Sequence, residues 1–172
     1  MALLPILKYP DPRLKEPALP VTKFDAELEK LVEDMAETMY AAPGIGLAAN
    51  QVGVLLRLFI IDIASEDEPS DLKVFVNPEI VELTGTQVYE EGCLSFPGAS
   101  EEIKRAAKVR VRAQDQKGNP FELVADGLLA VAIQHENDHI NGVLMIDKVN
   151  PLKRRKISRQ VHDAQVRAGD AI

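Results

Sequence analysis

The chain has 172 residues, of which 46% are hydrophobic, and this length suffices for one substantial core, so we expect a single catalytic domain over residues 1–172. The net charge of −7 argues against general nucleic-acid binding, since phosphate-binding proteins usually present a broad basic surface. The first ten residues contain Pro5 and Pro10 and no basic leader. They fit neither a signal peptide nor a membrane span, so the cytoplasm is the expected compartment.

The first predicted element is a one-sided helix over residues 22–42. Its apolar residues recur at helical spacing, Thr22 is the expected N-cap, and a Pro-Gly pair follows its end. The glycine-punctuated segment 44–53 is expected to form a loop. Residues 57–63, rich in β-branched and aromatic side chains, then predict a buried strand.

Several short strands are expected after an acidic turn at residues 65–71. Their predicted ranges are 74–77, 79–84, 87–90, 108–114 and 121–124. The last two flank a turn-rich segment and are typical of a hairpin. Consecutive strands of this kind favour antiparallel pairing.

Two further helices complete the predicted fold. Residues 126–140 are apolar on nearly every side, which predicts a helix buried at the centre of the domain. Residues 151–167 combine a few apolar side chains with many basic ones, as in an exposed terminal helix. The predicted fold class is therefore α+β: antiparallel strands around a central buried helix, with an N-terminal helix packed outside and a C-terminal helix.

The most informative motif is the HExxH sequence within Gln134–His139. Residues four apart share one face of a helix, so His135 and His139 can hold one metal ion. Glu136 then lies beside a water molecule whose pKa the metal lowers, and its carboxylate can move a proton from that water to a leaving nitrogen. Histidines and acids at the end of an apolar helix are costly to bury unless a metal satisfies them. The motif predicts metal-assisted amide hydrolysis.

A third protein ligand must come from elsewhere, and the downstream sequence narrows the choice. The longer protease pattern with a third histidine fails because Met145 occupies that position, and no glutamate follows Glu136. We favour Cys93, because a thiolate binds zinc or ferrous iron strongly. An inert buried cysteine is the alternative reading of Cys93. The other ligands left open are Asp147, His162 and Asp163.

The segment Gly44–Gly53 is a weaker signal. Its glycines and alanines let the backbone pass close to another group, and Gln51 offers an amide side chain. A substrate-binding edge and a tight helix-to-strand connection explain this segment equally well.

Three motifs together, Gly44–Gln51, Glu91–Ser95 and Gln134–His139, resemble in order and spacing the signature motifs of the peptide deformylase family. The resemblance runs from Tyr9–Arg13 to the basic C-terminal helix, as in the bacterial type. It implies a hydrolase of the bacterial cytoplasm that removes the formyl group from the N-terminal formyl-methionine of newly synthesised proteins and releases formate. The implied cofactor is one divalent metal ion, natively ferrous iron, Fe(2+), with zinc, nickel or cobalt as possible replacements.

The resemblance also implies residue roles. The metal ligands would be Cys93, His135 and His139, with Glu136 as the acid/base. The Gln51 side chain and the Leu94 backbone N–H would stabilise the oxyanion. Ile45 and Gly46 would form a tight approach for the small formyl group, and Gly46 would pair with the extended peptide. The apolar wall for the methionine side chain would comprise Leu128, Val131 and Ala132.

Two further expectations follow from the resemblance. Many family members carry a basic residue near the peptide cleft after Pro97, whereas this chain reads Gly98–Glu102, so its contacts with later substrate residues should differ. An ion pair between Glu91 and Arg105 is retained. The basic C-terminal helix would give transient docking on the ribosome, since its local charge suits an RNA surface, although a solvated face explains the charge as well.

Two other functions remain as alternatives. A general zinc peptidase would take Asp147 or Asp163 as third ligand, keep its metal after Cys93→Ala and cleave unformylated peptides. A structural metal site or a binding module for N-terminal peptides would lose nothing but binding after Glu136→Ala.

Overall fold

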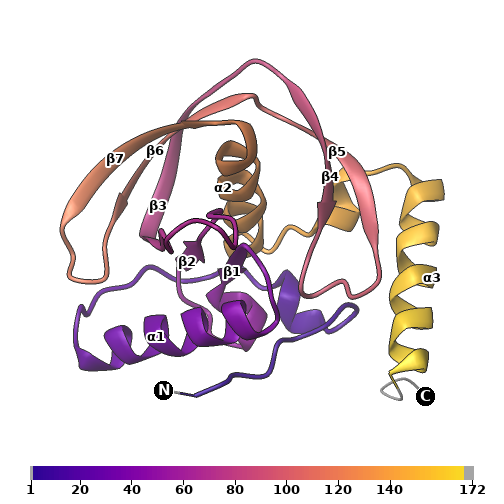
Figure 1. Cartoon of the computed structure of the whole chain (residues 1–172), viewed down its shortest axis with the longest axis horizontal. Helices are drawn as coiled ribbons and strands as arrows, with labels where there is room; N and C mark the ends of the chain where they lie inside the picture. The colour runs from indigo at the N-terminus through magenta and orange to yellow at the C-terminus, as the bar shows by residue number, and fades with distance from the viewer. Residues whose placement is uncertain (1, 169–172) are drawn as a thin grey trace.

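The computed structural model describes residues 2–168, in which antiparallel strands enclose one central helix (Figure 1). The helices are α1 Ala26–Ala41, α2 Gly127–Ile140 and α3 Pro151–Arg167. The strands are β1 Gly46–Ala48, β2 Leu58–Ile61, β3 Lys73–Thr84, β4 Gln87–Gly92, β5 Ser100–Arg105, β6 Lys108–Gln114 and β7 Pro120–Asp126. Short 3-10 helices cover Pro12–Lys15, Ala49–Val52 and Met145–Lys148. No helix within residues 2–168 has the length and apolar character needed to cross a bilayer.

The named strands form two sheets, and every pairing between them is antiparallel. One sheet has the order β1-β2-β3-β6-β7, and the other consists of β4 and β5. Strand β2 is buried along its whole length, and alternate side chains point to opposite faces. Phe59 and Ile61 pack in the cluster that includes α2, while Leu58 and Ile60 pack in the cluster that includes α1. The sheet thus separates α2 from α1, and the predicted α+β class is confirmed.

Helix α3 lies against the two-stranded sheet, apart from α1 (Figure 1). Ile157 and Val161 are its buried side chains, and they join a third apolar cluster with Phe96 and Ile103. Gly98 approaches the helix so closely that an added Cβ would lie 2.7 Å from Cβ of Ala164. Close packing therefore holds one side of α3 against the rest of the fold, while most of its surface faces solvent.

The structure corrects the predicted start of the first helix. Thr22 is not the N-cap, because the helix begins at Ala26 and the Asp25 side chain accepts the Leu28 N–H at 3.1 Å. An aspartate directly before the first turn satisfies one of the unpaired amides there and also favours the positive end of the helix dipole.

Other boundaries also differ from the sequence predictions. The expected loop at 44–53 contains strand β1 and a 3-10 helix. The two runs predicted at 74–77 and 79–84 form one strand, β3, whose register shifts beside Asn77 at a positive φ of 50°. Strand β5 was missed, because its alternation of exposed and buried residues is hidden by charged side chains that turn out to be buried.

Candidate active site

Helix α2 places the two histidines of the motif on one face. Their Nε2 atoms lie 3.2 Å apart, and both side chains are buried. Ala130 and Ile133 of α2 pack in the apolar cluster with the large sheet, while His135 contacts Glu91 of the two-stranded sheet. The geometry expected for His135 and His139 is present.

Cys93 follows directly after β4 and brings its sulfur to the histidines. Its Sγ lies 3.3 Å from Nε2 of His139. Within residues 2–168, these three residues are the one group of cysteine, histidine or acidic side chains found close enough to hold a metal ion, with ligand atoms within 4.8 Å of one another. The alternative ligands are elsewhere: Asp147 pairs with Lys15, and His162 and Asp163 are exposed on α3.

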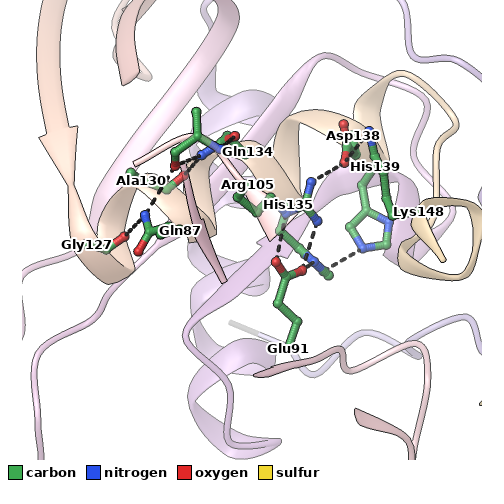
Figure 2. Close-up of polar contacts among 11 residues, drawn as sticks. Gln87, Glu91, Arg105, Gly127, Ala130, Gln134, His135, Asp138, His139 and Lys148 are labelled. Carbon is green, nitrogen blue, oxygen red and sulfur yellow. Dashed lines mark hydrogen bonds and ion pairs between the residues drawn. The ribbon is translucent and has the colours of Figure 1, made fainter. Parts of the chain in front are cut away.

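A buried ion-pair network supports this group. Arg105 donates two hydrogen bonds to the Glu91 carboxylate, at 2.7 and 2.8 Å, and a third to Asp138 at 2.6 Å. The Glu91 carboxylate also contacts Nδ1 of His135, at 2.9 Å (Figure 2). Burial alone would raise the pKa of Glu91, but the hydrogen bonds from Arg105 and His135 outweigh it and lower that pKa. Glu91 is therefore an ionised carboxylate that orients the His135 ring.

The donor set fits a divalent metal ion. In the neutral ring, an Nδ1–H bonded to Glu91 would leave the lone pair of His135 Nε2 directed at Cys93 and His139, as in carboxylate–histidine–metal arrangements. Burial lowers the pKa of His139 well below its ordinary value, which keeps this imidazole neutral. Burial alone would lower the pKa of His135, but the charge interaction and hydrogen bond with Cys93 and the hydrogen bond with Glu91 outweigh it and raise that pKa well above its ordinary value. The surroundings of the His135 ring thus favour a positive charge there.

Glu136 is buried beside this group on α2. Its Oε1 atom has no hydrogen-bond partner among the described residues, and burial raises the pKa of its carboxyl to about 7. Such a pKa suits a group that exchanges protons near neutral pH. The β1 backbone lies directly against it, because a Cβ on Gly46 would come within 2.6 Å of Oε2. Glycine at position 46 therefore has a steric reason: it makes room for the Glu136 carboxylate.

Gln51 and Leu94 are the two residues to which the resemblance gives an oxyanion role. The Gln51 side chain donates from Nε2 to Ser95 Oγ at 3.0 Å and lies 3.6 Å from Cys93 Sγ. Leu94 follows Cys93, and its side chain packs against Gly44. Gln51 thus lies within contact distance of the proposed metal ligand Cys93, and Leu94 is its neighbour in the chain.

A small pocket of about 80 Å³ opens beside Glu136 and His135. Its apolar walls include Leu128, Val131 and Ala132 from α2 and Ile45 from the segment before β1. A larger cavity of about 460 Å³ is also lined by Ile45, together with the segment around Asp62–Ser70, but none of the three ligand residues lines it. The small pocket is the one next to the reacting groups.

Sequence reasoning missed three contributors to this site. Tyr89 and Gly92 also line the small pocket, and Ser95 holds the Gln51 amide. Ser95 stands two residues after Cys93 within a motif already singled out, so its position was a usable signal. Tyr89 gave none, because an aromatic residue in a strand is usually explained by packing alone.

The fold and the site define a class of protein: a metallohydrolase whose central helix carries two histidines and a glutamate beside a cysteine thiol. Known proteins are similar to this chain over nearly its full length. The family model described as Polypeptide deformylase matches residues 3–155. A peptide deformylase from Chromobacterium violaceum is 53% identical over 161 residues, which cover 94% of this chain and 95% of that protein.

Solved structures agree with the sequence relatives. The crystal structure of a peptide deformylase from Legionella pneumophila has a TM-score of 0.93 at 46% identity and covers 99% of both chains. A peptide deformylase from Synechococcus elongatus in complex with actinonin has a TM-score of 0.85 at 42% identity, covering 98% of this chain and 89% of that one. The chain therefore belongs to the polypeptide deformylase family, and it is a metallohydrolase that removes the N-terminal formyl group from nascent proteins.

Proposed function

We propose that Cys93, His135 and His139 bind one divalent metal ion and that Glu136 is the acid/base of deformylation. The observation that carries this proposal is the convergence of one sulfur and two Nε2 atoms beside a buried carboxyl group whose pKa is about 7. When bound at these three residues, a metal ion would act as a Lewis acid that polarises the formyl carbonyl and lowers the pKa of water. The Glu136 carboxylate takes a proton from the attacking water and delivers it to the leaving methionine nitrogen.

The neighbouring groups bind and orient the formylated peptide. The Gln51 N–H and the Leu94 backbone N–H hold the formyl oxygen as negative charge develops on it, and removal of one such donor typically costs about 3 to 4 kcal/mol of transition-state stabilisation. Strand β1 is at the edge of its sheet, so the backbone near Ile45 and Gly46 is available for pairing with the extended peptide. Leu128 and Val131 contact the methionine side chain in the small pocket.

The test measures formate released from formyl-Met-Ala-Ser under anaerobic conditions. Wild type should release formate, whereas Glu136→Ala should bind metal normally but release almost none. Glu90→Ala, which removes an exposed carboxylate on β4, is the matched control and should behave as wild type. The proposal fails if well-metallated wild type releases no formate, or if Glu136→Ala retains the activity.

The ligand set has its own test, in which the metal content of two variants is compared. Cys93→Ala should lose the metal, while Asp147→Ala should keep it, because Asp147 is engaged by Lys15 and by the Leu144 N–H. The opposite result would revive the general zinc peptidase, which should also cleave unformylated peptides.

We further propose ferrous iron as the native metal. One thiolate and two imidazoles suit Fe(2+) as well as zinc, and nickel or cobalt can take the same donors. Elemental analysis of protein purified without oxygen should find iron at about one atom per chain. Zinc as the dominant metal in such a preparation would contradict this assignment.

We propose two features of the cellular setting, the bacterial cytoplasm as compartment and transient docking of α3 on the ribosome. The substrate is a nascent chain, and Arg154 and Arg155 are exposed on α3. Charge reversal at both arginines should reduce co-sedimentation with ribosomes. The same reversal at Arg110 and Arg112, exposed on β6, is the control and should not. Equal co-sedimentation of both double variants would contradict docking through α3, and cell fractionation tests the compartment.

A further inference from the structure

Gln51 and Ser95 form a buried contact that the reaction described above does not yet use. Gln51 Nε2 donates to Ser95 Oγ at 3.0 Å, and the two side chains are 1% and 0% exposed. They come from different motifs, 44 residues apart in the chain. A hydroxyl that accepts a hydrogen bond in so dry a place restricts its partner strongly, because water offers no alternative there.

The other end of the Gln51 amide is fixed as well. Its Oε1 accepts the Ala48 backbone N–H at 2.9 Å. A flipped amide would turn its NH₂ group toward the Ala48 N–H, and two donors cannot bond each other. The Ala48 contact therefore determines which end of the amide faces Ser95 and Cys93.

The two hydrogens of the Gln51 NH₂ group then have different surroundings. One points to Ser95 Oγ. The second lies in the amide plane about 120° from the first, and Cys93 Sγ, at 3.6 Å from Nε2, is the neighbour on the side of the ligand atoms. Because Ser95 holds the first hydrogen, the second is directed toward Cys93 Sγ. This is the side on which we place the formyl oxygen of the substrate.

The N-terminal segment holds the backbones of both residues in register. The Leu7 N–H donates to the Gln51 carbonyl at 2.7 Å, and the Tyr9 N–H donates to the Ser95 carbonyl at 2.8 Å. The Tyr9 ring stacks on Phe96 with centroids 4.9 Å apart. One extended segment thereby sets the distance between the two side chains.

We propose that Ser95 is a positioning residue for deformylation, whose hydroxyl holds the Gln51 amide so that its second N–H, which faces Cys93 Sγ, is directed at the formyl oxygen when substrate binds. This inference rests on the proposed role of Gln51 as an oxyanion donor. Ser95 itself touches neither the substrate nor the reacting atoms; it acts through Gln51.

The experiment is a double-mutant cycle on the metal-loaded enzyme, with kcat and KM measured per bound metal atom. Gln51→Ala should lower kcat by about 10²–10³-fold, as does loss of one oxyanion-hole donor. Ser95→Ala should lower kcat by about tenfold, the effect of one neutral hydrogen bond, with little change in KM. In the Gln51→Ala background, Ser95→Ala should change kcat by less than about twofold, since the residue that it positions is gone.

Two further variants separate positioning from folding. Ser95→Cys keeps a side chain of similar size with a weaker acceptor and should be impaired in kcat, whereas Ser95→Thr keeps the hydroxyl and should retain more activity than Ser95→Ala. Ser158→Ala, on α3, is the matched serine control and should match wild type.

Each outcome has a distinct meaning. Two results would overturn the role of Ser95 and leave that of Gln51 intact. One is that Ser95→Ala lowers kcat equally in wild type and in the Gln51→Ala background. The other is that Ser95→Ala has a normal kcat while Gln51→Ala is impaired. Normal kcat for Gln51→Ala would overturn both that role and the proposed oxyanion role of Gln51.

Discussion

Helices α2 and α3 are similar in length but are held in the fold by different forces. Nine of the 14 residues of α2 are buried, among them charged and polar groups, whereas two of the 17 residues of α3 are buried. Around α2, buried charged side chains form ion pairs with one another. Along α3, lysines with about half of their side chains exposed pair with one acid. Loss of one partner should therefore be costly at α2 and mild at α3.

Arg105→Ala should give the largest loss of stability. It would leave the Glu91 carboxylate buried without the guanidinium that supplies two of its hydrogen bonds, and breaking such a pair typically costs about 3–5 kcal/mol. The free energy of unfolding by urea measures this. The control is Arg110→Ala, which removes exposed pairs and should cost about 1 kcal/mol or less. Equal losses in the two variants would mean that the buried network adds no stability beyond that of a surface pair.

Gly46→Ala should damage activity more than stability. The new Cβ would meet Glu136 Oε2 at 2.6 Å, and displacing that carboxylate by about 1 Å should lower kcat by about a hundredfold. Gly44→Ala is the matched control, because its Cβ would meet the movable end of the Leu94 side chain, so its effect on kcat should be smaller. Steady-state formate release by both variants decides between them, and comparable rates would count against a steric role for Gly46.

The sequence predicted the ranges of both helices, but it predicted the contacts of α2 only in part. The range of α3 was predicted in full, because a basic exposed helix is determined by local pattern and by the proline at its start. The range of α2 was nearly right too, and its HExxH spacing predicted the paired histidines. The contact of Glu91 with His135 spans 44 residues and depends on how β4 packs against α2, which no local pattern encodes. The Arg105–Glu91 pair came from the family resemblance alone.

Gly98→Ala should loosen α3. Its φ of +79° is unfavourable for residues with a Cβ, at a cost of roughly 1–2 kcal/mol, and the new methyl group would also meet Ala164 and the Gln160 carbonyl. Gly127→Ala is a sharp control, since its φ is also positive but its Cβ would have open space. Hydrogen exchange of the α3 amides should rise in Gly98→Ala and stay normal in Gly127→Ala. Unchanged hydrogen exchange in both variants would mean that contacts other than the close approach at Gly98 hold α3 in place.

The smallest effect should come from the acid that α3 binds. Glu101 accepts from Lys156 at 2.9 Å and pairs with Lys153 at 3.2 Å, and these contacts lower its pKa from 4.5 to about 2. A lowered pKa in the folded state means stability that is fully present above pH 4.5 and is lost as pH falls toward 2. Because both lysines are well exposed, the effect should be about 1 kcal/mol or less and should weaken in salt.

Glu101→Gln isolates this contribution from every other acid titration in the chain. The difference in unfolding free energy between wild type and Glu101→Gln should be constant from neutral pH down to about pH 5 and then shrink toward zero as Glu101 becomes protonated. Glu102→Gln, the exposed neighbour on β5, should show no such dependence. A difference for Glu101→Gln that persists unchanged at pH 3 would mean that the carboxylate charge is not what ties α3 to the sheet, and that Ile157, Val161 and the close approach at Gly98 suffice to hold it.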